Sequence, residues 1–198
     1  RFDGGLQGFN NIIKLFFDAP DRVKASGKRV VAKWALSPVD PIYAGGALAY
    51  DPYTHETLLH TVFGEETEIP KYAIEAGLGP DLCPWNLAMA GAIISKRNTM
   101  PIDLYSTACG SWCDNVAKSW YFISRETSKP YHFIEIPIFD KETNEWAVDY
   151  VIQELELLFN WLKKHTGQEV TDEALRKEIK RENKVRQVML EITELLQA

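Results

Sequence analysis

Hydrophobic and polar positions in the first third of the chain predict a helix followed by a strand. Residues 2–17 repeat large apolar side chains at three- and four-residue spacing, which predicts a short helix that residues 18–21 break with two Asp and a Pro. Residues 28–36 are apolar and β-branched and predict a strand. The pattern over residues 51–68 is weak, so we expect a loop there with one helical turn.

The middle of the chain alternates between helical and strand patterns. Helices are predicted at residues 81–95, with Asp81 as the candidate N-cap, and at residues 114–125. Buried strands are predicted at residues 102–108 and 131–138. Strand and helix units of about thirty residues predict an α/β fold with a parallel sheet of the Rossmann or flavodoxin type and flanking helices. Function in such a sheet lies beyond the carboxyl ends of the strands.

The last sixty residues or so predict a long helical hairpin. Apolar positions form one stripe up to Gly167, and a second helix begins at Thr171 or Asp172. We therefore divide the chain into an α/β domain, residues 1–140, and a helical segment, residues 141–198, that leads toward a second domain not present here. The chain opens on an Arg rather than a Met, and its last helical pattern has no stop signal, so we expect a piece of a longer polypeptide.

Composition narrows the classes of partner. The chain has 198 residues, of which 45% are hydrophobic, and its formal net charge of −6 gives no attraction to nucleic acid or to an anionic membrane. Its longest apolar run, residues 87–94, is too short to span a bilayer. Three cysteines are an odd number, which fits a disulfide-stapled secreted domain poorly. We expect a cytoplasmic protein with no nucleic-acid or membrane partner.

The cysteines are the sharpest chemical signal. Cys109 and Cys113 follow the predicted strand at residues 102–108, and Cys83 opens a predicted helix. Backbone N–H groups at helix starts favour thiolates, so these positions suit a metal. Spacing alone leaves open the alternative that they are buried thiols that act as small hydrophobes. Cys109 and Cys113 do not form a C-x-x-C pair, so zinc-ribbon and thioredoxin-like sites are not favoured.

Ser37 is a candidate catalytic residue because it comes just after the first predicted strand, at the position where substrates contact such sheets. A turn or capping role for its hydroxyl is the alternative. His55 and His60 lie five residues apart, which is not the spacing of a helical metal-binding pair. The sequence carries neither a G-x-S-x-G elbow nor a P-loop.

Several short segments together resemble the 2-hydroxyacyl-CoA dehydratase and benzoyl-CoA reductase superfamily, including the D-component of 2-hydroxyglutaryl-CoA dehydratase. The segments are GLGPDLC at residues 77–83, the strand that begins near residue 103, CDNVAKSWY at residues 113–121 and PYHFIEIP at residues 130–137. The resemblance runs from about residue 27 onward and corresponds to the front half of a family subunit. The segment PVDP at residues 38–41 departs from the Pro-Glu-Glu-like step of many relatives.

The resemblance implies a [4Fe-4S] cluster held by three cysteines in each catalytic subunit. Cys83 and Cys113 stand where the first two ligands fall, and the third would lie beyond Ala198. Cys109 departs from the family pattern and is either a spare thiol or a substitute ligand. A cluster with three cysteine ligands keeps one iron open for another ligand.

The resemblance also implies an anaerobic reaction on an acyl-CoA thioester. A low-potential electron would give a ketyl radical anion, followed by dehydration of a 2-hydroxyacyl-CoA or by reduction of a benzoyl-CoA-type ring. The implied partners are a second homologous subunit, in a heterodimer, and an ATP-dependent iron–sulfur activator protein. Two alternatives stay open: a double-cubane-type reductase of small molecules, and a non-catalytic α/β subunit that binds a partner and whose cysteines are structural.

Overall fold

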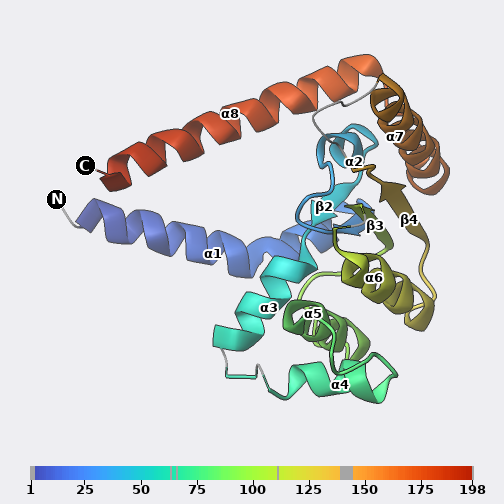
Figure 1. Cartoon of the computed structure of the whole chain (residues 1–198). Coiled ribbons are helices and arrows are strands. Elements are labelled where there is room, and N and C mark those ends of the chain that lie inside the picture. The colour runs from blue at the N-terminus through green and yellow to red at the C-terminus, as the bar shows by residue number, and fades with distance from the viewer. Residues whose placement is uncertain (1–2, 63, 66, 111, 139–144, 198) are drawn as a thin grey trace.

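A computed structural model of the chain describes residues 3–62, 64–65, 67–110, 112–138 and 145–197. Four parallel strands form one sheet in the order β2-β1-β3-β4 (Figure 1). The strands are β1 (Val30–Lys33), β2 (Leu48–Tyr50), β3 (Leu104–Cys109) and β4 (Tyr131–Glu135). The helices are α1 (Asp3–Ser26), α2 (Asp40–Ala44), α3 (Pro52–Val62), α4 (Ile69–Glu75), α5 (Pro84–Ile94), α6 (Asp114–Glu126), α7 (Glu145–Thr166) and α8 (Asp172–Gln197). The predicted α/β class, with a parallel sheet, flanking helices and a C-terminal helical region, is confirmed.

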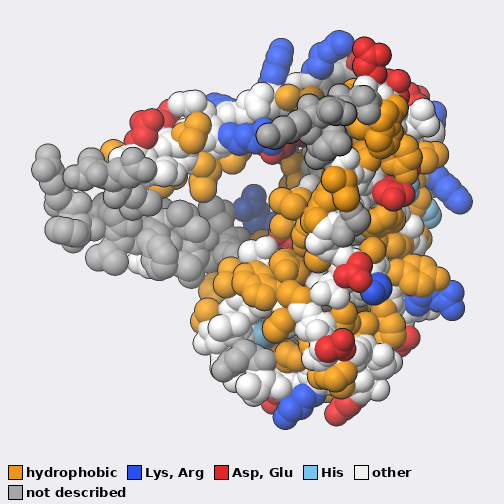
Figure 2. Space-filling model, in the orientation of Figure 1, with side chains coloured by type: hydrophobic (Ala, Val, Ile, Leu, Met, Phe, Trp, Pro, Cys, Tyr) orange, Lys and Arg blue, Asp and Glu red, His pale blue; other side chains and the backbone are white. Residues whose placement is uncertain are grey.

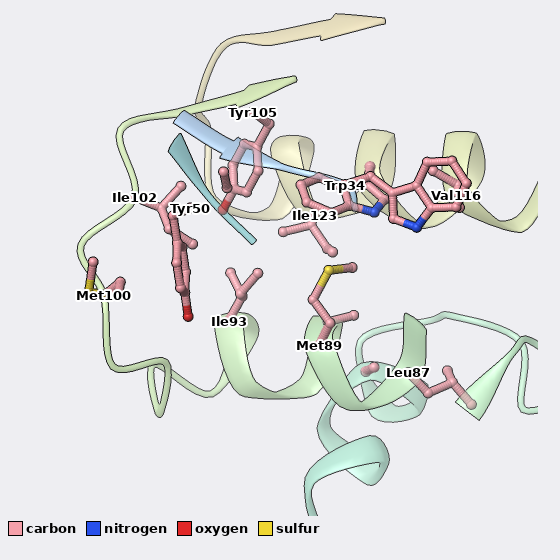
Figure 3. Close-up of a cluster of buried hydrophobic side chains, with 14 of the residues drawn as sticks. Trp34, Tyr50, Leu87, Met89, Ile93, Met100, Ile102, Tyr105, Val116 and Ile123 are labelled. Carbon is pink, nitrogen blue, oxygen red and sulfur yellow. The ribbon is translucent and has the colours of Figure 1, made fainter. Parts of the chain in front are cut away.

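One face of the sheet packs against α5 and α6. Side chains on alternate positions of each strand reach this face, because successive residues of a strand point to opposite sides. In β3 the apolar members of this set are Tyr105 and Cys109. Met89 and Ile93 of α5 point toward Tyr105 and Ile123, which closes the core between the helices and the sheet (Figure 3).

The opposite face of the sheet packs against α2 and α7. Leu104 and Ala108 of β3 meet Leu158 and Leu162 of α7 there. The next helix, α8, begins at the Thr171 cap, where the Thr171 Oγ1 accepts a hydrogen bond from the Ala174 N–H at 3.2 Å. Helix α7, the first helix of the predicted hairpin, contributes Leu158 and Leu162 to this core. The division of the chain at residue 140 stays a prediction.

The outer parts of α1 and α8 extend from the sheet toward the same side of the molecule (Figure 1). Helix α8 carries an exposed apolar face, part of which is visible as hydrophobic atoms along the helix in Figure 2. This face consists of Val185, Val188, Met189, Ile192 and Leu195. No helix in the described part of the chain is both long enough and apolar enough to cross a membrane.

Three local predictions were wrong. Helix α1 does not end at residues 18–21 but continues to Ser26 with Pro20 inside it. Its side chains Ala19 and Val23 pack against the core, and this burial offsets the helix-breaking cost of the proline. Residues 51–68 contain the full helix α3 rather than one turn.

Helix α3 begins where the Asp51 carboxylate accepts hydrogen bonds from the backbone N–H and the hydroxyl of Thr54, an N-cap arrangement. The third wrong prediction concerns α5. This helix begins at Pro84 with Cys83 at its N-cap, so Asp81 does not cap it.

Candidate functional site

The strand order reverses between β1 and β3, and ligands of such sheets bind beyond the carboxyl ends of the strands at this point. Trp34 and Ser37 follow β1, and Cys109 is the last residue of β3. The chain then passes to α6, whose N-cap is Cys113. The parallel topology thus brings one serine and two cysteines to the same edge of the sheet.

Cys83 and Cys113 occupy equivalent positions at the starts of two neighbouring helices. Cys83 is the N-cap of α5 and Cys113 is the N-cap of α6, and both are half-buried free thiols. Neither sulfur makes a capping hydrogen bond to its own helix. Helix N-termini carry unpaired N–H groups and the positive end of the helix dipole, which stabilise thiolates. Neither sulfur is thus committed to capping its own helix, which leaves both in a position to bind a ligand.

Tyr53 of α3 lies close enough to both Cys83 and Cys113 to interact with them electrostatically. Its Oη lies 3.8 Å from the Cys83 Sγ, within hydrogen-bond range for sulfur. Burial raises the pKa of Tyr53 to about 12, and the hydrogen bond with Cys83 and the negative charges of the Cys83 and Cys113 thiolates add to this effect. The Tyr53 hydroxyl consequently keeps its proton at neutral pH.

Two tryptophans hold the Tyr53 ring. The ring of Trp34 lies 6.4 Å from it, edge-on at 89°, and the ring of Trp85 lies 5.4 Å from it at 31°. Trp85 is 40% exposed, and Trp112, next to Cys113 in the sequence, is 51% exposed. The cysteines are thus bordered by large aromatic side chains that are partly open to solvent, as at sites that bind an apolar group.

Cys109 lies in a different environment from the other two cysteines. It is 0% exposed, and its thiol donates to the backbone oxygens of Cys113 at 3.2 Å and Gly110 at 3.4 Å. Burial raises the pKa of the Cys109 thiol, and the charge of Cys113 raises it further. A Cβ at Gly110 would overlap the Ile136 carbonyl oxygen and the Trp112 ring, so the loop beside Cys109 is tightly packed. This geometry favours the spare thiol over the substitute ligand.

Ser37 ties the ends of β1 and β3 together. It is 5% exposed, and its Oγ accepts a hydrogen bond from the Ala108 N–H at 2.8 Å. The hydroxyl thus satisfies a buried backbone donor on the neighbouring strand, a long-range structural role rather than a local turn or capping bond. A catalytic role for Ser37 stays a prediction.

The comparison with known families decides the assignment. The family model described as 2-hydroxyglutaryl-CoA dehydratase, D-component, matches residues 36–198, which is most of the chain and includes all three cysteines. The chain belongs to this family. No curated protein gives a significant match to it. The resemblance drawn from the cysteine and proline segments is confirmed, and the chain is a component of a dehydratase-type enzyme that works with other components.

The donor chemistry of Cys83 and Cys113 fits the iron–sulfur cofactor for which this family is known. Iron–sulfur clusters are held by cysteine thiolates, and these two sulfurs are accessible and lie at helix N-termini. Within the described ranges, no three His, Cys, Asp or Glu side chains are grouped so as to hold a metal ion. Cys83 and Cys113 therefore suit two ligand positions of such a cluster, and the described residues do not provide the remaining ligands.

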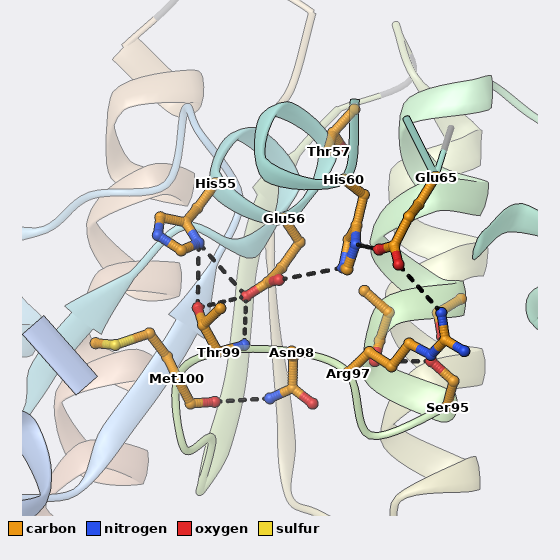
Figure 4. A network of polar contacts seen from close by, with 12 residues as sticks. His55, Glu56, Thr57, His60, Glu65, Ser95, Arg97, Asn98, Thr99 and Met100 are labelled. Atoms are coloured by element: carbon orange, nitrogen blue, oxygen red, sulfur yellow. Dashed lines mark hydrogen bonds and ion pairs between the residues drawn. The ribbon is translucent and has the colours of Figure 1, made fainter. Parts of the chain in front are cut away.

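The sequence did not reveal a buried polar network centred on Glu56 of α3 (Figure 4). Glu56 is 0% exposed, and its Oε1 accepts hydrogen bonds from the Tyr50 hydroxyl and, at 3.0 Å each, from the N–H and hydroxyl of Thr99. His55 Nδ1 lies 3.4 Å from the same oxygen. Burial raises the pKa of Glu56, but the hydrogen bonds from His55, Tyr50 and Thr99 outweigh it and hold the pKa below its ordinary value.

The second histidine of α3 extends this network. His60 Nε2 lies 3.6 Å from Glu56 Oε2, and His60 Nδ1 lies 2.6 Å from Glu65 Oε2 (Figure 4). The other oxygen of that carboxylate, Glu65 Oε1, lies 3.5 Å from Arg97 Nη1. The histidines therefore serve a buried carboxylate rather than a helical metal pair. The sequence signal for this network was the i, i+4 spacing of Glu56 and His60, which fits one face of a helix. The network fixes α3, and with it Tyr53, against the segment at residues 95–100.

Proposed function

We propose that this chain carries two of the three cysteine ligands of a [4Fe-4S] cluster in a 2-hydroxyacyl-CoA dehydratase-type enzyme. The observation that supports this most is the pair of half-buried cysteines, Cys83 and Cys113, at the starts of two adjacent helices at the switch-point edge. The third ligand would lie beyond Ala198, as the resemblance implies. Residues 1–140 would form the cluster-bearing domain, and residues 141–198 would lead to the next domain.

The residues around these cysteines suit a site where negative charge accumulates. The N-termini of α5 and α6 provide unpaired N–H groups that stabilise added negative charge. Trp34, Tyr53 and Trp85 cover one side of the site and limit the access of water. When bound, the cluster would supply a low-potential electron and one iron open to the oxygen of an acyl-CoA thioester. Ser37, at the same edge, is the residue of this chain that we place nearest to substrate contact.

The proposed partners follow from what the chain itself provides. It carries no phosphate-binding motif in its sequence, so electrons would come from a separate ATP-dependent iron–sulfur activator protein. A second homologous subunit would complete the enzyme. The substrate would be a 2-hydroxyacyl-CoA that loses water, and a benzoyl-CoA-type ring reduction is the alternative reaction of the same scaffold.

The reaction can be tested with the protein purified without oxygen together with its natural partner. Activator, ATP and a reductant are added, and water loss from 2-hydroxyacyl-CoA thioesters is followed in parallel with reduction of benzoyl-CoA. We expect turnover of a 2-hydroxyacyl-CoA that Cys83→Ala and Cys113→Ala abolish. Cys109→Ala is the matched control and retains turnover, because its thiol contacts backbone oxygens. Wild-type turnover in either of the first two variants would contradict the proposal.

A further inference from the structure

The Tyr53 hydroxyl lies beside a proposed cluster ligand but is not itself a ligand. Its Oη lies 3.8 Å from the Cys83 Sγ, and it comes from α3, which contributes no cysteine. In a free thiol either atom can donate this hydrogen bond. A cysteine sulfur that is deprotonated or bound to iron has no proton, so the tyrosine must then be the donor.

We propose that Tyr53 is a positioning residue that raises the reduction potential of the cluster by donating a hydrogen bond to the Cys83 sulfur. This inference rests on the proposed role of Cys83 as a cluster ligand and adds a residue that sets the reduction potential of that cluster. Hydrogen bonds to the sulfurs of an iron–sulfur cluster are one of the factors that set its potential. The bond is stronger when the sulfur carries more negative charge, so it favours the reduced cluster.

The donor is held in place from three sides. Trp34 packs edge-on against the Tyr53 ring and Trp85 lies tilted over it. Helix α3 is fixed by the buried Glu56, three residues along the chain, which accepts hydrogen bonds from the N–H and the hydroxyl of Thr99. A side chain fixed in this way loses little further freedom when its hydroxyl bonds to sulfur, so the interaction is preorganised.

The hydroxyl can be removed without disturbing the ring, because Tyr53→Phe keeps the contacts with both tryptophans. We expect this variant to bind as much iron as the wild type but to have a more negative midpoint potential. The ratio of reduced to oxidised cluster at the wild-type midpoint should fall about tenfold, which for a one-electron couple corresponds to a shift of about 59 mV. Replacement of Tyr53 by 3-fluorotyrosine, whose hydroxyl is a stronger donor, should shift the potential in the opposite direction.

The experiment is an anaerobic redox titration, followed by electron paramagnetic resonance, of the protein with its partner. Tyr72→Phe is the matched control, because the Tyr72 hydroxyl contacts Glu68 and Arg97 instead of a cysteine, and it should leave the potential unchanged. An unchanged potential in Tyr53→Phe with full iron would overturn the inference and leave the proposed function standing. Iron loss in Tyr53→Phe together with an unshifted potential in the fluorotyrosine protein would also overturn the inference. That result would indicate that the Tyr53 hydroxyl has a structural role. Wild-type protein without iron would overturn both.

Discussion

Gly91 of α5 lies where that helix crosses the start of α4, and replacing it with alanine tests this close packing. A Cβ at Gly91 would lie 2.7 Å from the Ile69 carbonyl carbon and closer still to the carbonyl oxygen. Ile69 is buried and begins α4, so its backbone cannot rotate away as a side chain would. Gly91→Ala therefore forces α4 and α5 apart.

Two opposing effects set the magnitude. Alanine is favoured over glycine inside a helix by about 1 kcal/mol. Overpacking in a core costs about 1–3 kcal/mol, and an overlap with backbone belongs at the upper end. We expect Gly91→Ala to lower the free energy of unfolding by about 2 kcal/mol, as the difference between these effects. Gly8 of α1 is the control, since a Cβ there meets nothing within 4 Å, and Gly8→Ala should raise stability by about 0.5–1 kcal/mol.

Urea unfolding followed by circular dichroism measures both variants against the wild type, with the slope of the transition compared to detect any change in the unfolded state. The expected result is opposite signs for the two glycines. A Gly91→Ala protein as stable as Gly8→Ala would refute the close approach of α5 to the Ile69 carbonyl.

The remaining predictions concern three polar residues. The folded-state pKa of Glu56 is lower than the ordinary value of 4.5, so the Glu56 carboxylate contributes stability at neutral pH that is lost as pH falls below that value. In Glu56→Gln the free energy of unfolding should therefore fall less steeply with decreasing pH. Equal slopes in the variant and the wild type would contradict this. Burial and the neighbouring Glu182 raise the pKa of Asp40 to about 6, so the protonated carboxyl stabilises the fold and this contribution is lost as pH rises through 6. We expect Asp40→Asn to raise the free energy of unfolding by about 1 kcal/mol at pH 8 and by less at pH 5. Thermal unfolding at the two pH values measures this difference. Ser37→Ala removes the acceptor of a buried N–H and should cost about 1–3 kcal/mol in urea unfolding; loss of acyl-CoA turnover in still-folded protein would indicate a substrate role for its hydroxyl, and unchanged turnover would exclude one.

Elements with a long apolar run were predictable from the sequence. Strand β3 is buried along its whole length, and helix α5 is apolar on most of its surface, so the pattern identified both. Strand β2 is three residues long, which is too short for alternation to reveal it. Helix α3 was missed because buried polar residues, Glu56 and His60, interrupt its apolar face, and only their hydrogen-bond partners explain their burial.

The candidate site was predictable only where a local sequence pattern or the resemblance identified its residues. Helix-start positions and the resemblance pointed to Cys83 and Cys113, and the structure has both at N-caps. The environment of Cys109 was not predictable, since it depends on which way the tight Gly110 loop turns the thiol. The approach of Tyr53 to Cys83 spans thirty residues of sequence and depends on how α3 and α5 pack, which no local pattern reports.

The central claim, that Cys83 and Cys113 hold an iron–sulfur cluster, is tested most directly by counting iron and acid-labile sulfide in each protomer. The protein would be purified without oxygen with its partner, as wild type and as the Cys83→Ala, Cys113→Ala and Cys109→Ala variants. The account predicts about four irons in the wild type and in Cys109→Ala, and their loss in the other two variants. A clear excess over four would indicate a double-cubane-type reductase instead. Colourless, iron-free wild-type protein would contradict the account and leave an α/β subunit whose cysteines are structural.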